Sequence, residues 1–262
     1  GTIGLEPARL FNPNFSWEVN KKLEMALEMG FLNDRIVLTT AFFKNRSSNQ
    51  LVGIPLPGTT GFNSIQANLD ATVENSGLEI ELRTRNFEKN NFKWTTSLNL
   101  TVPENKLLNF PNLEGSVYAN QYIIGQSLSI RKVYEFKGVN PNTGIYEFTD
   151  FNGDGLLTAA EDRQKIVDTA PKFFGGIQNS LIYKNWQLDF LLQFVKQVGI
   201  NNNAVSDLPG SASNMTTDVL DHWQQIGDTN PTQVFTAGFN DAAVNAFYTY
   251  YASSDAAYSD AS

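Results

Sequence analysis

The chain has 262 residues, of which 41% are hydrophobic and 18% are charged, and its formal net charge is −8 at pH 7. This length and composition suffice for a folded core and argue against disorder. The acidic balance without a block of Lys or Arg argues against nucleic-acid binding, and the absence of Cys excludes disulfides and thiolate chemistry. No apolar run is long enough for a transmembrane helix, a test that does not exclude membrane strands.

The clearest pattern covers residues 17–31, where seven of the eight odd positions are apolar. These are Trp17, Val19, Leu23, Met25, Leu27, Met29 and Phe31. A helix is a rival interpretation because Lys, Leu, Glu, Met and Ala favour helices, but it would place Met25 and Met29 away from the apolar stripe. The period of two predicts a strand longer than the usual length of about five or six residues. Asn33 and Asp34 predict a turn, and residues 35–43 predict the returning strand.

The same unit recurs twice. Residues 78–83 and 92–100 alternate on either side of a turn at 88–91, and residues 173–183 and 186–194 alternate around Lys184 and Asn185. The connections at 44–69, 104–171 and 199–245 are long and rich in Gly, Pro, Asn and Ser. Long strands, tight turns at one end, long loops at the other and aromatic residues near strand ends are typical of outer-membrane β-barrels.

The predicted fold class is therefore all-β, with antiparallel hairpins that form part of a large transmembrane β-barrel with long extracellular loops. About six strands are predicted, fewer than the eight of the smallest such barrels, and an open sheet edge is not tolerated in lipid. We therefore expect residues 1–262 to be one partial barrel, with an extracellular loop region at 104–171.

Residues 150–161 match a twelve-residue calcium loop. Oxygen ligands are expected from the side chains of Asp150, Asn152, Asp154, Thr158 and Glu161 and from the carbonyl of Leu156, with Gly155 at the sharp turn. The flanking segments differ from an EF-hand, because residues 144–149 are extended in pattern and only 159–167 could form a short helix. We expect a structural Ca²⁺ that orders a long loop, against the alternative of an Asp/Asn/Gly turn without an ion.

Catalysis is not expected. His222 is the only His and has no second His or Cys for a zinc site. Glu79 and Glu81 share one face of a strand, which leaves open a glycosidase pair, but together with Arg83 they are better explained as the water-facing set of a barrel strand.

Several segments resemble one family. The chain is similar to the barrel of SusC/RagA-type TonB-dependent outer-membrane transporters of Bacteroidota from about residue 10 onward and in one register. The similar segments are residues 12–24, 30–36, 55–62, 73–79, 92–99, 150–162, 171–176 and 220–224.

The resemblance implies a plugged, 22-stranded barrel in the bacterial outer membrane that imports large nutrients such as glycans or peptides. It also implies a SusD-like surface lipoprotein as partner and energy from TonB, contacted through a segment outside this sequence. We therefore expect a section of the C-terminal half of such a barrel.

The alternative is a secreted, soluble β-sandwich that binds glycans or partners and is stabilised by the same calcium. In that fold the odd-numbered side chains of residues 17–31 would form the core.

Overall fold

The structure, a computed structural model, describes residues 10–201 and 207–260. The chain divides into two compact units. The first comprises Gly1–Leu128 with Phe173–Gln193, and the second comprises Ser129–Lys172 with Phe194–Ser262. Each unit is described by itself below.

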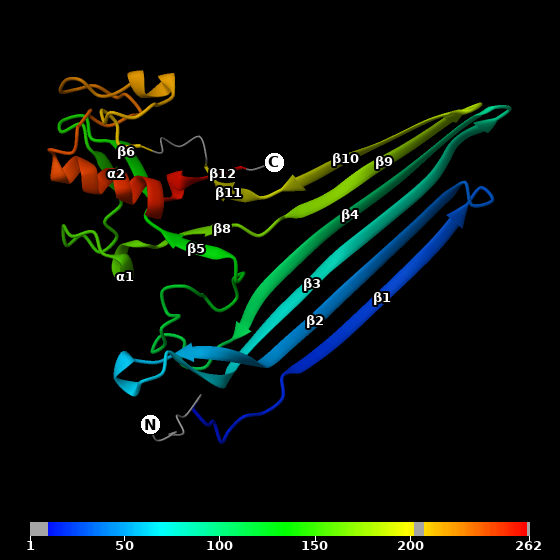
Figure 1. Cartoon of the computed structure of the whole chain (residues 1–262), viewed down its shortest axis with the longest axis horizontal. Coiled ribbons are helices and arrows are strands. Elements are labelled where there is room, and N and C mark those ends of the chain that lie inside the picture. Colours follow the sequence, from blue (N-terminus) through cyan, green and yellow to red (C-terminus); the bar gives the residue numbers. More distant parts are fainter. Residues whose placement is uncertain (1–9, 202–206, 261–262) are drawn as a thin grey trace, which may run out of the picture. The chain divides into compact units, whose positions relative to one another are not determined.

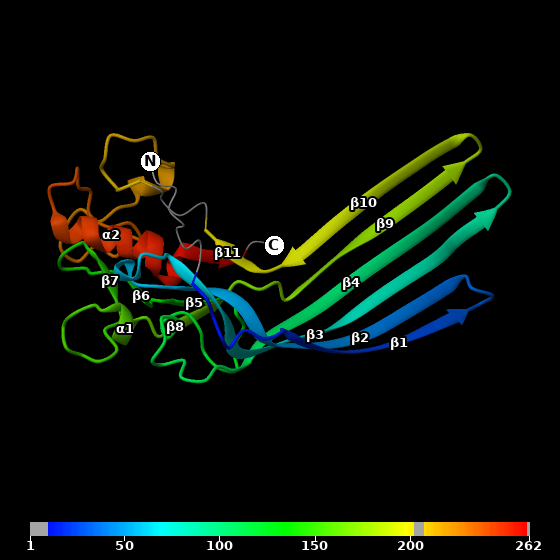
Figure 2. The ribbon, with the colours of Figure 1, turned by 60° about the horizontal axis from the view of Figure 1, so that its bottom comes forward.

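The first unit is built on a six-stranded sheet with the order β1-β2-β3-β4-β9-β10. Its strands are β1 (Val19–Phe31), β2 (Ile36–Pro55), β3 (Ser64–Lys89), β4 (Phe92–Asn109), β9 (Phe173–Tyr183) and β10 (Trp186–Lys196), and a short 3-10 helix (Gly58–Thr60) joins β2 to β3. The pairs from β1 to β9 are antiparallel. The tight turns of the three hairpins lie at one end of the sheet (Figures 1 and 2). This is the all-β arrangement of hairpins that the sequence predicts, and the sheet is open rather than closed on itself.

The tight turns form where the sequence places residues that tolerate a left-handed backbone. Asn33, Asp34 and Asn90 have φ values of 53°, 58° and 51°. Asn and Asp accept this conformation more readily than other side chains because they can hydrogen-bond locally. Lys184 also has a positive φ of 53° and opens the turn between β9 and β10.

The hairpins are staggered relative to one another. Ile36, the first residue of β2, pairs with Thr84, but β3 continues beyond that point to Lys89. The β3–β4 hairpin therefore extends further than the β1–β2 hairpin. Phe92 pairs with Tyr183, so the β9–β10 turn is level with the β3–β4 turn along the ladder.

The expected loop at 44–69 is wrong over most of its length. The β2–β3 ladder runs on through this segment until Pro55 pairs with Ser64, with one irregularity between Ser48 and Gln50. A polar strand has no alternation that distinguishes it from a loop, yet its backbone groups pair as well as those of an apolar strand. Similarly, β4 continues to Asn109, past residue 104, where the loop region was expected to begin.

A small core closes the loop end of the first unit. Ala71 and Val73 of β3 pack with Leu107 and Phe110, all of them buried. The partly buried side chains of Leu69, Leu113, Tyr118, Tyr122 and Leu128 surround them. The segment after β4 is thereby fixed to the sheet by burial of apolar surface.

The second unit contains short elements around its own core. They are β5 (Ile130–Val133), β6 (Phe136–Val139), β7 (Tyr146–Phe148), α1 (Ala159–Asp162), β8 (Lys165–Asp168), β11 (Val198–Ile200), a 3-10 helix (Thr217–Leu220), α2 (Asp241–Ser253), a 3-10 helix (Asp255–Ala257) and β12 (Tyr258–Asp260). The strands pair as β5–β8, β6–β7 and β11–β12. Ile130 and Val133 are buried, as are Ala243 and Phe247 of α2. In the described residues, no helix is both long and apolar enough to cross a membrane.

Candidate functional site

The register of the sheet collects apolar side chains on one face, called here the apolar face. One row across β1 to β4 consists of Leu27, Thr40, Ile80 and Leu100, each paired with the next. The neighbouring row joins Met29, Leu38, Leu82, Leu98 and Ile177. Because side chains alternate along a strand, all of these lie on the same side of the sheet.

The apolar face is exposed. Leu23, Met25 and Leu27 are 50%, 58% and 56% exposed, and Leu188, Phe190 and Leu192 of β10 are also exposed. Contiguous apolar surface on this scale marks a surface that contacts a partner or a membrane. The first unit has one sheet among its described residues, so the second layer of the alternative β-sandwich is missing.

Aromatic side chains gather at the turn end of this face. Phe31, Tyr183 and Trp186 lie next to the tight turns and are exposed, and Trp94 is partly exposed. Tyr and Trp rings favour the boundary between hydrocarbon and water because each combines an apolar body with a polar group. The turn end therefore has the composition of an interfacial belt.

A small polar cluster interrupts the apolar face near that belt. Asn179 accepts hydrogen bonds through Oδ1 from Trp94 Nε1 at 3.0 Å and from Thr96 Oγ1 at 2.7 Å. Thr96 Oγ1 in turn accepts one from Asn86 Nδ2 at 2.6 Å, and Asn86 Oδ1 accepts one from Thr84 Oγ1 at 2.8 Å. The cluster thus supplies hydrogen-bond partners from within itself for these polar atoms, as an apolar setting requires.

Charged side chains follow the apolar face at the end away from the turns. Arg46 and Lys44 of β2 both form ion pairs with Glu74 of β3, the latter at 3.1 Å. The register places Lys21, Arg46, Glu74 and Lys106 in one row across four strands. These four residues with Lys44 are called here the charged row.

The opposite face of the sheet is polar. Glu28 pairs with Thr39, Thr39 with Glu81, and Glu81 with Asn99. Glu81 also forms an ion pair with Arg83 at 3.2 Å. The predicted water-facing set of Glu79, Glu81 and Arg83 thus lies on this polar face.

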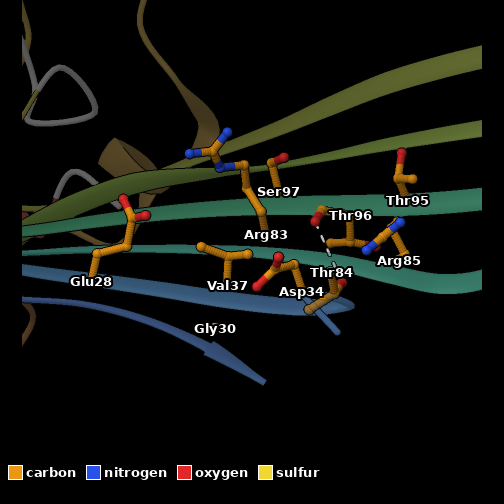
Figure 3. Close-up of a pocket in the computed structure, with 10 residues that line it drawn as sticks. All are labelled: Glu28, Gly30, Asp34, Val37, Arg83, Thr84, Arg85, Thr95, Thr96 and Ser97. Carbon is orange, nitrogen blue, oxygen red and sulfur yellow. Dashed lines mark hydrogen bonds between the residues drawn. The ribbon is translucent and has the colours of Figure 1, made fainter. Parts of the chain in front are cut away.

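A recess of about 510 Å³ is hollowed into the polar face near the turns (Figure 3). It is lined by Glu28, Gly30, Asp34, Val37, Arg83, Thr84, Arg85, Thr95, Thr96 and Ser97, which come from the first two hairpins. Arg85 is fixed at its edge, because its guanidinium donates a hydrogen bond to the carbonyl of Asn33 at 2.7 Å. The lining suits water or a polar surface rather than an apolar ligand.

The predicted calcium loop lies in the second unit, between β7 and α1, and folds around the carboxylate of Asp150. The amide N–H groups of Gly153 and Gly155 donate to this carboxylate at 2.7 and 2.8 Å. These hydrogen bonds, with that of Gly155 the largest cause, lower the pKa of Asp150 below its usual value. Gly153 and Gly155 have φ of 75° and 81°, as the sharp turn requires.

The other expected ligands of this loop are only partly assembled. Asp154 Oδ1 accepts a hydrogen bond from the amide of Leu156, and Asn152 Nδ2 donates to Asp154 Oδ2 at 3.0 Å. Glu161 instead accepts a hydrogen bond from Thr158 Oγ1 at 3.1 Å. Among the described residues, no three acidic or His side chains form a group that could hold a metal ion as they stand. The expected ligands therefore do not form an assembled ion site in this structure.

Asp162 fixes this loop, a role that sequence reasoning missed. Its side chain is fully buried and joins the two ends of the loop. Oδ1 accepts from the amide of Phe151 at 2.8 Å, and Oδ2 from the amide of Thr158 at 2.7 Å. Its position directly after the twelfth loop residue was the only available signal. The charged row was also missed, because Arg46, Glu74 and Lys106 lie beyond the apolar alternation of their strands and Lys21 is a single exception within its own.

A family model described as TonB-dependent receptor-like β-barrel matches residues 4–143, more than half of the chain. Two similar curated proteins come from Formosa agariphila. TonB-dependent receptor P3 is 27% identical over 238 residues, covering 81% of this chain and 24% of its own. TonB-dependent receptor P26 is 28% identical over 229 residues, covering 78% and 22%. The chain spans about a quarter of the length of these relatives.

Solved structures share the fold. The RagAB peptide importer in its "closed-closed" state matches with a TM-score of 0.71 and 19% identity, over 90% of this chain and 28% of the other. The RagAB peptide transporter matches with a TM-score of 0.65 and 20% identity, over 85% and 26%. The resemblance to SusC/RagA-type transporters expected from the sequence is confirmed at the level of family and fold.

Proposed function

The chain belongs to the TonB-dependent receptor β-barrel family, and from this membership we propose that it is a section of the wall of an outer-membrane transporter. Proteins of this family are transporters rather than enzymes, so the glycosidase interpretation of Glu79 and Glu81 is wrong. The observation that carries the proposal is a single sheet with one exposed apolar face and one polar face.

The two edges of the sheet support this assignment. Within the part of the chain that the structure describes, the outermost strands, β1 and β10, each have a neighbour on one side only. Unpaired backbone groups along such an edge are not stable in lipid, because nothing there replaces their hydrogen bonds. We infer that strands from the rest of the protein pair with both edges and close the wall into a large barrel.

The substrate class and the partner follow from the same premise. The similar RagAB structures are of a peptide transporter. We propose that the whole protein imports a large nutrient, a peptide or a glycan, together with a SusD-like surface lipoprotein and with energy from TonB. The apolar face then contacts outer-membrane lipid, the polar face lines the lumen, and the residues that follow β4, up to 171, contribute to the extracellular loops.

Fractionation of the source cells tests the proposal. An antibody against this sequence should detect a band in the outer-membrane fraction that shifts on boiling and is several-fold heavier than the 29.1 kDa of this chain. Deletion of the gene should abolish growth on a peptide or glycan source while growth on glucose continues. A soluble band at 29.1 kDa would support the secreted β-sandwich instead.

We also propose that the loop at 150–161 holds a structural Ca²⁺. Asp150, Asn152 and Asp154 supply side-chain oxygens on one side, Leu156 its carbonyl, and Thr158 and Glu161 oxygens on the other. Such a set suits a hard cation that takes six to eight oxygen ligands. Bound calcium would supply a charge that draws the loop together, and no step of transport depends on it here.

Calcium titration of the intact purified protein tests this part. We expect Ca²⁺ to slow proteolysis within residues 150–161, and we expect Asp150→Asn and Glu161→Gln to remove this protection. Glu114→Gln, which changes an exposed carboxylate outside the loop, is the matched control and should leave it intact. Protection that is identical with Ca²⁺ and with a chelator would contradict the calcium site and leave the transporter assignment standing.

A further inference from the structure

The charged row lies on the same face of the sheet as the apolar residues. Arg46 is four residues from Phe42 on β2, and Lys106 is four from Val102 on β4, so each shares a face with those apolar side chains. Lys21 holds the same relation to Met25 on β1. On β2, β3 and β4 the row therefore begins where the apolar face ends, whereas on β1 Val19 continues the apolar alternation past Lys21.

Glu74 organises the cations of the row. Its side chain is 11% exposed and accepts contacts from Lys44 and Arg46, whose side chains are 37% and 51% exposed. The largely buried carboxylate of Glu74 thus holds Lys44 and Arg46 in place while both cations remain accessible to a ligand. Lys106 pairs with Glu104 at 2.6 Å, and Lys21 has no ion pair among the described residues. The row's four cations outnumber its Glu74 and the adjacent Glu104, so this part of the surface is positive although the whole chain is acidic.

The turn end of the apolar face has no such cluster. On this face Lys89 at the end of β3 and Lys184 in the third turn lie singly. Arg35 and Arg85 are neighbours, since the guanidinium of Arg35 donates to the carbonyl of Arg85, but Arg85 lines the recess in the polar face. Aromatic side chains dominate there instead. The two borders of the apolar face therefore differ in charge, and only the border away from the turns concentrates positive side chains in adjacent rows.

We propose that the charged row binds the phosphate of a lipid head group in the membrane leaflet next to the loops. Lys and Arg at the end of an apolar band extend their stems along apolar surface and place the charge at head-group level. A phosphate there meets the guanidinium of Arg46 and the ammonium of Lys44, both oriented by Glu74. Acyl chains of the same lipid cover Phe42 and Val102 below.

The inference rests on the proposed membrane barrel, since it requires the apolar face to contact lipid. It adds a binding site on the outside of the wall for an anionic lipid, separate from the lumen and from any transported nutrient. The site selects a phosphorylated lipid over a neutral lipid with the same acyl chains.

Native mass spectrometry of the intact detergent-purified protein tests the site with two probes, lipid A and phosphatase-treated lipid A. We expect the wild-type protein to retain the phosphorylated form at least about tenfold better, from the usual contribution of basic residues at an anionic surface. Lys44→Gln/Arg46→Gln should remove most of this preference. Lys21→Gln should weaken it about fivefold, whereas Lys22→Gln, the adjacent Lys on the polar face, should leave it unchanged.

A further variant guards against simple misfolding, because the double variant leaves Glu74 without its partners. Lys44→Gln/Arg46→Gln/Glu74→Gln makes this part of the row neutral and should assemble normally but still lack the preference. Equal retention of both lipids by a wild-type barrel that assembles in the outer membrane would overturn this inference alone. Absence of the wild-type protein from that membrane would overturn the proposed function as well.

Discussion

The ring of Phe43 on β2 covers the backbone of Gly77, its partner on β3. A Cβ atom at residue 77 would lie 2.6 Å from Cζ of Phe43 and 2.9 Å from the carbonyl oxygen of Val102. The aromatic ring occupies the space that any side chain at Gly77 would need, so the contact fixes the register of β2 against β3 on the polar face.

We predict that Gly77→Ala destabilises the folded barrel by about 1–3 kcal/mol, because the added methyl group meets a ring and a backbone oxygen that cannot both move away. The urea midpoint of the intact protein in detergent measures this. Gly53→Ala is the matched control on β2, since its Cβ would find Ser64 Oγ at 3.6 Å, an ordinary contact. Equal urea midpoints for the two variants would show that the ring of Phe43 moves away from the added methyl group without loss of stability.

Substitutions on adjacent residues of β1 separate its two faces. Leu27→Arg places a charge on the apolar face and should cost about 2–4 kcal/mol near the bilayer midplane, which blocks assembly. Ala26→Arg places the same side chain on the polar face and should assemble almost normally. The heat-shifted band on a gel reports assembly. If both variants behave alike, the apolar face does not contact lipid.

Asn179 holds the polar cluster together within the apolar face. Asn179→Ala removes the acceptor of both Trp94 Nε1 and Thr96 Oγ1, and we expect a loss of about 1–3 kcal/mol of stability. Trp94→Phe removes one donor without leaving an unpaired Oδ1, since Thr96 remains, and should cost less. Unfolding in urea compares the two. A larger effect of Trp94→Phe would indicate that ring packing matters more than the hydrogen bonds.

Asp162 should stabilise the loop at 150–161 whether or not calcium is present. Asp162→Ala leaves the part-buried amides of Phe151 and Thr158 without their acceptor, at a cost of about 3 kcal/mol. We expect hydrogen exchange to accelerate across residues 150–162 both with Ca²⁺ and with chelator. Asp150→Asn should accelerate it mainly with Ca²⁺. Identical patterns for the two variants would mean that the roles of Asp162 and Asp150 are not separable.

The pairing of β5 with β8 should weaken in acid. Lys165 Nζ and Thr149 Oγ1 donate to Glu135, each at 3.0 Å, and the Lys165 contact is the main cause that lowers the pKa of Glu135 below its usual 4.5. A carboxyl with a lowered pKa stabilises the fold above its unfolded pKa, and this contribution is lost as pH falls through the folded value. The same contact raises the pKa of Lys165, whose contribution is lost only as pH rises above about 10.5.

Hydrogen exchange of residues 165–168, corrected for intrinsic rates, measures this effect. Protection should be constant near neutral pH and decline below about pH 4.5. Glu135→Gln should flatten the decline. Glu147→Gln, whose carboxylate accepts a hydrogen bond from the neutral amide of Asn140, is the control and should keep it. An unchanged decline in Glu135→Gln would assign the acid sensitivity to another group.

The sequence was informative where alternation coincides with the apolar face. The alternation through residues 17–31 and 186–194 identified β1 and β10, and Asn33, Asp34 and Lys184 marked turns that the structure confirms. Alternation with a period of two is visible in a sequence only where one face of the strand is apolar and the other is polar, so it predicts strands only in that part of the sheet. For this reason the hairpins near the turns were predictable.

The rest of the fold and of the candidate site depends on contacts that produce no periodic pattern in the sequence. The polar half of the β2–β3 ladder was mistaken for a loop, because backbone pairing rather than side-chain pattern maintains it. The charged row could be recognised only once the register of four strands was known, because only that register places Lys21 and Lys106 in the same row. In the sequence, Asp162 looks like an ordinary surface residue that follows the twelve-residue loop, and only its burial in the structure reveals its role.

The rows of paired residues across this sheet do not each mark one depth in the bilayer. Strands of such barrels incline by about 40° to the membrane normal and lie about 4.8 Å apart, so each step across the sheet changes height by about 3 Å. Leu27 and Leu100, three strands apart in one row, therefore meet hydrocarbon layers about 9 Å apart. An Arg scan along β1 and a scan along a row would both cross the bilayer obliquely, by about 2.6 Å per residue and about 3 Å per strand.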